Sequence, residues 1–213
     1  ILNAFRDGEI DILLGTQMVA KGLDFENVTL VGVINADQQL NNDDFRSQER
    51  TFDLLTQVVG RAGRGKYKGT AVIQTCNPQN DVIQIAAKQD YEAFFEDEIK
   101  TRKTLIYPPY CDICLIGFVS ENENKVKFAS QKFTDILKEK LSGEYNELKI
   151  IALGPMAARV SKISNKFRYR LILKCKNTKR FRAVMNELLK YTGTDKAYND
   201  VSVYIDINPE NII

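Results

Sequence analysis

The sequence YPPY at residues 107–110 divides the chain into two parts with different patterns. Two adjacent prolines end a preceding helix, because proline lacks a backbone N–H and its ring clashes with the previous turn. Before this point, apolar runs alternate with helical segments, and after it the order of strands and helices changes. The sequence therefore predicts two domains, residues 1–106 and residues 107–213.

The charge also changes sign between the two parts. Residues 1–100 carry 10 Lys and Arg against 16 Asp and Glu, a net −6, while residues 101–213 carry 20 against 12, a net +8. A contrast of this size indicates two units with different partners. No apolar run approaches the roughly 18 residues that cross a bilayer, so we expect no membrane partner.

The first part has the pattern of an α/β domain. We expect strands over 9–16, 27–37 and 69–75, and helices over 47–64 and 81–105. Near-continuous apolar strands that alternate with helices predict a parallel sheet. Three strands make a poor domain alone, so we expect further strands upstream of Ile1 and interpret the chain as a fragment.

The second part has the order β-α-β-β-α-β. We expect strands over 111–119, 149–154, 158–163, 167–175 and 201–207, with the two short segments 149–154 and 158–163 merged into one strand or one of them left at an edge. Helices are expected over 123–141 and 178–191, and SNKF (164–167) as a hairpin turn. This order predicts a ferredoxin-like α+β domain.

The chain contains no histidine and four cysteines. Cys111 and Cys114 form a C-x-x-C pair, which raises the possibility of a redox or metal site. Without histidine or a second pair, we favour ordinary strand residues and expect no metal ligands in this chain. Free thiols indicate a reducing, cytoplasmic location.

Two glycine-containing motifs are typical of phosphate chemistry. In GTQMVAKGLDF (15–25), which follows the first expected strand, Thr16 suits a phosphate oxygen, Gly22 permits a tight turn and Asp24 could accept bonds from ribose hydroxyls. In QVVGRAGRG (57–65), Arg61 and Arg64 lie three residues apart on one expected helix face. Paired guanidinium groups can stabilise charge on a transferring phosphoryl group.

The segment RVSKISNKFRYRLILKCKNTKRFR (159–182) contains ten Lys or Arg and no acid. Strand alternation puts Phe167, Tyr169 and Leu171 on the side opposite the cations, so these side chains suit the core better than base stacking. The expected basic patch comprises Lys166, Arg168, Arg170, Lys174, Arg180 and Arg182. Such a patch suits either branched DNA or an acidic protein tail.

These motifs together carry a resemblance. The stretch 15–37 is similar to motif V of superfamily 2 helicases and QVVGRAGRG to motif VI, although Gln57 stands where DEAD-box proteins have histidine. With IQTCNP (73–78), YPPY, FRYRLILK (167–174) and VYIDINP (203–209), the chain resembles the PriA (primosomal protein N′) family of replication-restart helicases. The resemblance covers essentially the whole chain.

The resemblance implies a partial RecA-like second helicase lobe followed by the family's C-terminal domain, in a 3′-to-5′ DNA helicase driven by ATP with Mg²⁺. Arg61 is implied as the arginine finger. Arg64 and Gln57 would face the γ-phosphate and Asp24 the ribose. Thr16 would touch the DNA backbone or couple it to the nucleotide, while Lys21 would meet either phosphate or solvent. The implied partners are DNA forks and single strands, the acidic tail of single-stranded-DNA-binding protein, and other primosome proteins.

The chain lacks the P-loop, the Mg²⁺-binding acidic motif and the zinc module that the resemblance implies for a full-length protein. We therefore expect this fragment alone to lack ATPase activity. Two alternatives remain: a RecG-like fork-remodelling translocase, and a non-enzymatic nucleic-acid-binding protein derived from a helicase lobe. A P-loop in the reading frame upstream of Ile1 would support the motor.

Overall fold

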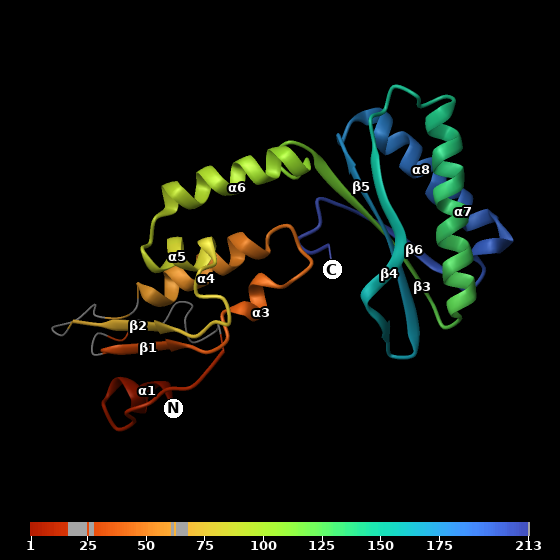
Figure 1. Ribbon diagram of the computed structural model, residues 1–213. Coiled ribbons are helices and arrows are strands. Elements are labelled where there is room, and N and C mark those ends of the chain that lie inside the picture. Colours follow the sequence, from red (N-terminus) through yellow and green to blue (C-terminus); the bar gives the residue numbers. More distant parts are fainter. Residues whose placement is uncertain (17–24, 26–27, 61, 63–67, 213) are drawn as a thin grey trace. The chain divides into compact units, whose positions relative to one another are not determined.

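The computed structural model describes residues 1–16, 25, 28–60, 62 and 68–212. The chain forms two compact units, Ile1–Thr101 and Arg102–Ile213, which we call the lobe and the C-terminal domain (Figure 1). Helix α6 (Tyr91–Leu105) runs across this division and ends just before the expected boundary at residue 106. In the described ranges, no helix has the length and apolar character needed to cross a membrane.

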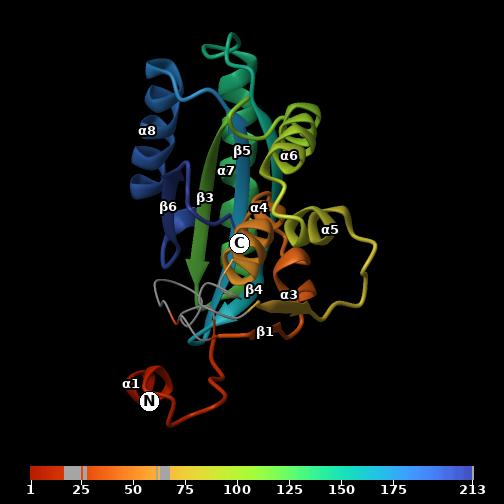
Figure 2. The ribbon, with the colours of Figure 1, turned by 90° about the vertical axis from the view of Figure 1, so that its left-hand side faces the viewer.

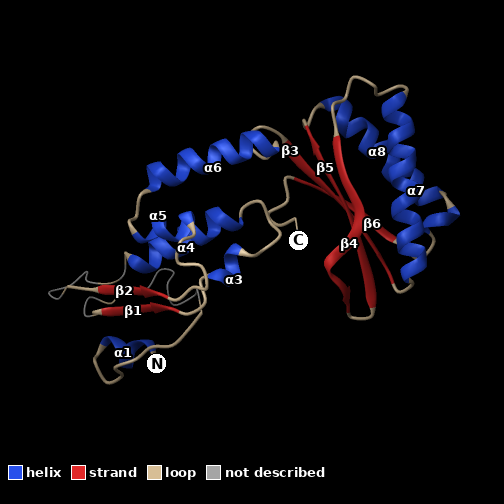
Figure 3. Cartoon of the chain, viewed as in Figure 1, coloured by secondary structure: helices blue, strands red, loops and turns tan. Residues whose placement is uncertain are grey.

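The lobe contains a parallel strand pair, as the alternating pattern predicts. Strand β1 (Leu30–Val33) pairs in parallel with β2 (Thr70–Ile73). Helices α3 (Asp37–Leu40), α4 (Ser47–Val59) and α5 (Asp81–Ala87) lie on one side of this pair, as Figure 3 shows. The rings of Phe52 on α4 and Phe94 on α6 stack with centroids 4.2 Å apart within the lobe's apolar core.

Part of the expected strand pattern is wrong. Residues 9–16 follow the short helix α1 (Leu2–Arg6) and form no strand, and the side chains of Ile12 and Leu14 are 83% and 82% exposed. A strand needs a neighbour that accepts its backbone hydrogen bonds, and the described residues supply none here. Strands β1 and β2 are also shorter than expected, and the side chains of Leu30 and Val72 are exposed.

The single helix expected over 81–105 is in fact two. Asn80 begins α5 by accepting hydrogen bonds from the backbone N–H groups of Val82 and Ile83, and α5 ends at Ala87. Gln89 then has a left-handed backbone with φ of 55°. Asp90 caps the new helix α6 by accepting from Ala93 N–H at 3.1 Å. Aspartate at a helix start is a common N-cap, and this signal could have located the break.

The C-terminal domain has the predicted ferredoxin-like topology. Its strands are β3 (Asp112–Ser120), β4 (Ile151–Ile163), β5 (Lys166–Cys175) and β6 (Ser202–Ile207). They form an antiparallel sheet in the order β4-β5-β3-β6, and Figure 2 shows β6, β3 and β5 side by side. Helices α7 (Glu123–Ser142) and α8 (Lys179–Thr194) cover one face, and a short 3-10 helix, η1 (Lys196–Tyr198), follows α8 (Figure 1).

Alternate residues of the central strands build the core under these helices. Ile116 and Phe118 of β3, with Leu171 of β5, are fully buried against Phe133 of α7 and Phe181 of α8. The other alternate residues of each strand point to the opposite side of the sheet. Residues 151–163 form one long strand, interrupted by irregular pairing between Leu153 and Met156 and between Ala157 and Lys162.

The predicted hairpin turn joins β4 to β5. Ile163 pairs with Lys166, and the two residues between them, Ser164 and Asn165, have φ angles of 48° and 62°. Positive φ at both central residues is the geometry of a type I′ turn, whose twist matches that of antiparallel strands. The serine and asparagine of SNKF therefore fix the register of the long β4–β5 hairpin.

An ion pair joins α7 to the end of α8, in addition to the pair between Lys140 of α7 and Glu187 of α8. Lys132 Nζ on α7 lies 2.7 Å from Asp195 Oδ2 at the end of α8, and Asp195 also accepts from the Tyr191 hydroxyl and Ala197 N–H. The hydrogen bond from Lys132, followed by the other two, lowers the pKa of Asp195 to about 2.

Because the pKa of Asp195 is lower in the folded chain than the ordinary 3.8, its stabilising effect is present above that value and is lost as the pH falls towards 2. We expect Asp195→Asn to lower the urea midpoint at pH 7, with the difference from wild type disappearing near pH 2. Asp135→Asn, an exposed change on α7, is the control and should leave the midpoint nearly unchanged. Equal midpoints of wild type and Asp195→Asn at pH 7 would contradict the assignment.

Candidate nucleotide and nucleic-acid sites

The motif residues expected at the nucleotide site are only partly within the described structure. Gly22, Asp24 and Lys21 of the first motif, and Arg61 and Arg64 of the second, lie outside the described residues. Thr16 is exposed and is the last described residue before the gap at 17–24. Gln57 is exposed on α4. The expected roles of all seven residues stay predictions.

Helix α4 ends at Val59, earlier than the expected residue 64, and Gly60 is its C-cap. The carbonyl of Thr56 accepts both Gly60 N–H at 2.9 Å and Gln89 Nε2 at 3.3 Å. A Cβ on Gly60 would lie 3.3 Å from that same Gln89 nitrogen. The glycine therefore allows the α5–α6 junction to approach the end of α4 just before the motif arginines.

A polar cluster that sequence reasoning missed holds the start of α4. The Asp44 side chain is completely buried, accepts the backbone N–H of Arg46 at 2.9 Å, and lies 3.8 Å from Arg50 Nη1. A buried carboxylate is stable only when it is paired and hydrogen-bonded. The string DDFRSQER (43–50), with an acid just before a helix and an arginine inside it, carried this signal.

A second carboxylate lies where the two parallel strands end. Asp37 follows β1 and accepts hydrogen bonds from Thr75 Oγ1 and Cys76 N–H, both at 2.7 Å, just after β2. The backbone N–H of Cys76, followed by the Thr75 hydroxyl, lowers the pKa of Asp37. This carboxylate joins the carboxyl ends of β1 and β2, the edge at which parallel α/β sheets bind ligands.

The basic residues of the C-terminal domain do not form one patch, and that expectation is wrong. Residues Lys166, Arg168 and Arg170 belong to the alternate set of β5 that faces away from the helices. Arg180 and Arg182 lie on α8, on the helix-covered side. Sequence proximity did not separate the two groups, because the chain passes from one side of the sheet to the other after Cys175.

Lys174 belongs to the same alternate set of β5 as Arg168 and Arg170, but its side chain is buried and cannot bind a ligand from solvent. Only 9% of the residue is exposed, its Nζ donates to the carbonyl of Leu105 at 2.6 Å, and it lies 3.6 Å from the Tyr107 ring centroid. Burial lowers the pKa of Lys174. Leu105 ends α6, so this lysine satisfies a carbonyl at a helix C-terminus. The lysine thereby attaches the end of α6 to β5.

The α8 arginines are also engaged within the domain. Arg180 Nε donates to Glu147 Oε1 at 2.9 Å, and its guanidinium lies 4.4 Å from the Tyr145 ring centroid. Arg182 Nη1 donates to Asn177 Oδ1 at 2.9 Å. The charge of Arg180 is therefore partly compensated, whereas Lys166 is exposed and Arg168 half-buried.

The two cysteines of the C-x-x-C pair have different environments, because Cys111 lies just before β3 and Cys114 lies within it. Cys111 donates to the carbonyl of Ile106 at 3.2 Å, while Cys114 is buried in the core, where burial raises the pKa of its thiol to about 12. Among the described residues, no group of three or more His, Cys, Asp or Glu side chains is arranged to hold a metal. The residues present in these ranges therefore do not fit a zinc site.

Two family models divide the chain in the same way as the fold. The helicase conserved C-terminal domain matches residues 1–66, and the primosomal protein N C-terminal domain matches residues 103–210. The chain belongs to the PriA family. This confirms the resemblance and the partial RecA-like lobe, and it favours PriA over the RecG-like alternative.

Curated relatives agree with this assignment. The chain is 41% identical, over 98% of its length, to the Replication restart protein PriA of Bacillus subtilis (strain 168), of which it covers 25%. It is 40% identical over its whole length to that of Borreliella burgdorferi, of which it covers 31%, and 42% identical over 82% of its length to that of Synechocystis sp., of which it covers 20%. The chain thus spans less than a third of these PriA proteins.

The buried carboxylate of Asp44 gives a stability prediction for the lobe. We expect Asp44→Ala to cost about 2 kcal/mol, because it removes a buried carboxylate that accepts the Arg46 N–H and lies beside the Arg50 guanidinium. Asp43→Ala is a matched control, since the neighbouring side chain is exposed and its loss should cost under about 0.5 kcal/mol. Urea unfolding monitored by circular dichroism measures both, and equal costs would contradict the role of Asp44.

Proposed function

We propose that this chain is the C-terminal part of an ATP-dependent DNA helicase that acts in replication restart and primosome assembly. The observation that carries the proposal is the pairing of motifs V and VI, within a helicase conserved C-terminal domain match, with a PriA C-terminal domain in the same chain. By the family resemblance, the motor moves 3′-to-5′ on DNA in the cytoplasm.

In the proposed mechanism, the lobe supplies one wall of an ATP site. Arg61 approaches the γ-phosphate and stabilises the negative charge that develops as the phosphoryl group is transferred to water. Arg64 and Gln57 face the same phosphate, while Asp24, beside the turn at Gly22, accepts from the ribose. The P-loop and the acidic motif that binds Mg²⁺ belong, in this proposal, to a first lobe.

The second function of the lobe is to couple the nucleotide to DNA. Thr16 and Lys21 lie in motif V, which resembles a segment that contacts the DNA backbone in superfamily 2 helicases. Backbone contacts position a protein on nucleic acid without sequence preference, which suits a translocating motor. Zinc is proposed only for the full-length protein, because the described residues do not offer a ligand set.

The role of Arg61 predicts a large loss of catalysis. We expect Arg61→Lys in the full-length protein to lower the rate of fork-stimulated ATP hydrolysis by about a thousandfold, since an arginine finger contributes 10³ or more to the rate. ATP binding, measured with a fluorescent analogue, should change much less.

Arg6→Lys, an exposed arginine of α1, is the matched control and should retain full activity. The isolated 213-residue chain should show no ATPase activity. Unchanged hydrolysis by Arg61→Lys would contradict the finger assignment, and activity of the isolated chain would contradict the two-lobe site.

We also propose that the C-terminal domain binds DNA through the side of its sheet that faces away from α7 and α8. Lys166 and Arg168 lie on this side. Among the described residues neither forms an ion pair with a carboxylate, whereas Arg180 pairs with Glu147. Cations that neutralise phosphates release bound counterions, so the binding constant falls as salt rises. The acidic tail of single-stranded-DNA-binding protein and other primosome proteins are further proposed partners.

The double variant Lys166→Gln with Arg168→Gln should weaken the binding of this chain to forked DNA. The slope of log K against log salt should become shallower by about one to two, since each lost phosphate contact contributes about 0.9. Fluorescence anisotropy over a salt series measures this slope, with Lys127→Gln on α7 as control. Unchanged fork binding together with loss of acidic-tail binding would favour the protein partner.

A further inference from the structure

The side of the C-terminal sheet that faces away from α7 and α8, which we call the open face, has one unusual position at its centre. Gly117 of β3 pairs with Arg170 of β5 on one side and with Tyr204 of β6 on the other. Directly paired residues share a face of the sheet. The open face therefore carries an arginine, a glycine and a tyrosine in one row across three strands.

The tyrosine covers the glycine. A Cβ added to Gly117 would come within 2.1 Å of Tyr204 Cζ, a distance that no side chain could tolerate. Only glycine therefore allows the Tyr204 ring to rest on the strand. Tyr204 is nevertheless 42% exposed, so its ring is also accessible to solvent.

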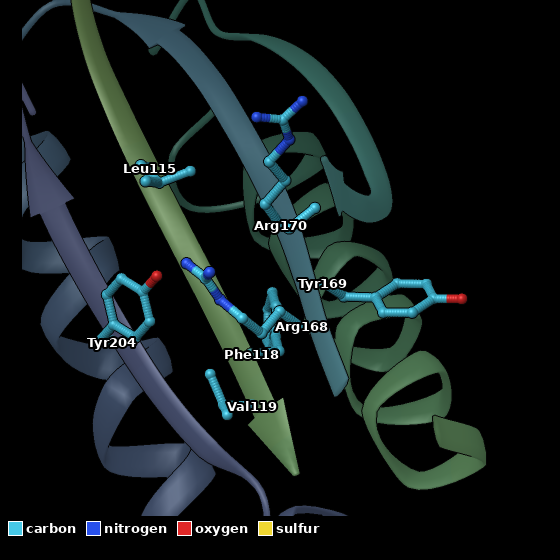
Figure 4. A pocket seen from close by; sticks show the side chains of 8 residues that line it. Leu115, Phe118, Val119, Arg168, Tyr169, Arg170 and Tyr204 are labelled. Carbon is cyan, nitrogen blue, oxygen red and sulfur yellow. The ribbon is translucent and has the colours of Figure 1, made fainter. Parts of the chain in front are cut away.

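Two arginines lie on the same face of the sheet as this ring. Arg168 and Arg170 line one shallow depression together with Tyr204, Leu115 and Val119. Figure 4 shows the guanidinium of Arg168 extending across β3 towards Tyr204, whereas Tyr169 points to the other side of the sheet. The residues that line the depression include two arginines and no acid, while the exposed Asp206 of β6 lies on the same face, paired with Leu115.

The second arginine is held in place. Arg170 Nη1 donates to the carbonyl of Ile212, and its Nε is buried without a hydrogen-bond partner among the described residues. This guanidinium is tied to the backbone rather than to a carboxylate. Arg170 therefore adds a fixed positive charge to the depression, while Arg168 is the arginine that extends to the ring.

We propose that the open face at Tyr204 binds one nucleotide of single-stranded DNA, with an unpaired base stacked on the exposed side of the Tyr204 ring and the adjoining phosphate bound by Arg168. The inference rests on the proposed DNA binding by the open face and adds a preference for unpaired bases. Aromatic side chains on a four-stranded sheet stack bases that are splayed out of a duplex. An acidic peptide would use the guanidinium groups but would gain little from the exposed ring.

The test measures the affinity of this chain for a labelled oligo-dT and for a duplex of equal length. Tyr204→Leu should weaken oligo-dT binding about tenfold, the effect of losing one stacked base, and should change duplex binding less than twofold. Tyr204→Phe should retain wild-type affinity for both. Phe128→Ala, which removes an exposed ring from α7, is the control.

A second variant displaces the ring without removing it. Gly117→Ala introduces the methyl group that collides with Tyr204, so it should reproduce the loss of oligo-dT affinity while the far-UV circular dichroism stays native. A 2-aminopurine base in the oligonucleotide should be quenched on binding to wild type and less so on binding to either variant.

The outcomes separate this inference from the proposed function. If Tyr204→Leu binds oligo-dT as tightly as wild type while Lys166→Gln with Arg168→Gln weakens fork binding, the stacking site is overturned and the DNA-binding face stands. If the wild-type chain binds neither DNA, both are overturned. A selective loss of single-strand affinity in both Tyr204→Leu and Gly117→Ala supports the inference.

Discussion

The antiparallel pairing of β3 with both β5 and β6 is the constraint on which the C-terminal domain depends. This strand lies inside the sheet, and its alternate residues serve two different faces. Cys114, Ile116 and Phe118 contribute to the core under α7 and α8, while Gly117 and Val119 lie on the open face. A slip of one residue would bring Gly117 into the core and expose the aromatic ring of Phe118. The same register thus holds the helices and aligns Arg170 with Tyr204.

Much of this domain could be predicted from the sequence because its elements are local and regular. The β-α-β-β-α-β order, the SNKF turn and both long helices follow from alternation, turn chemistry and helical spacing. The faces of β5 were also predictable, since Phe167, Tyr169 and Leu171 alternate with cations. The placement of Tyr204 was not predictable in this way, because nothing near it in the sequence indicates that Gly117 lies beneath its ring.

The lobe was harder to predict for a physical reason. Residues 9–16 have the composition of a buried strand, yet strand formation depends on a neighbour and not on composition alone. The break between α5 and α6 depends on one left-handed residue, Gln89, and on the cap at Asp90. Asp44 was missed because the acid and arginine of DDFRSQER indicate a possible pair at a helix start but do not show that the carboxylate is buried. The arginines of QVVGRAGRG are recognised by their spacing with glycine in the sequence, and this recognition does not depend on where strands and helices begin or end.

The contact between Gly60 and Gln89 has a consequence for how PriA sequences can vary. The last turn of α4 and the α5–α6 junction share the Thr56 carbonyl, and the space between them accommodates a glycine on one side and an amide on the other. A Cβ at position 60 would lie 3.3 Å from the Gln89 amide, so a larger residue there would displace this flexible side chain and weaken its bond to Thr56. The two positions, 29 residues apart in sequence, are therefore coupled, and changes in one during evolution should accompany changes in the other.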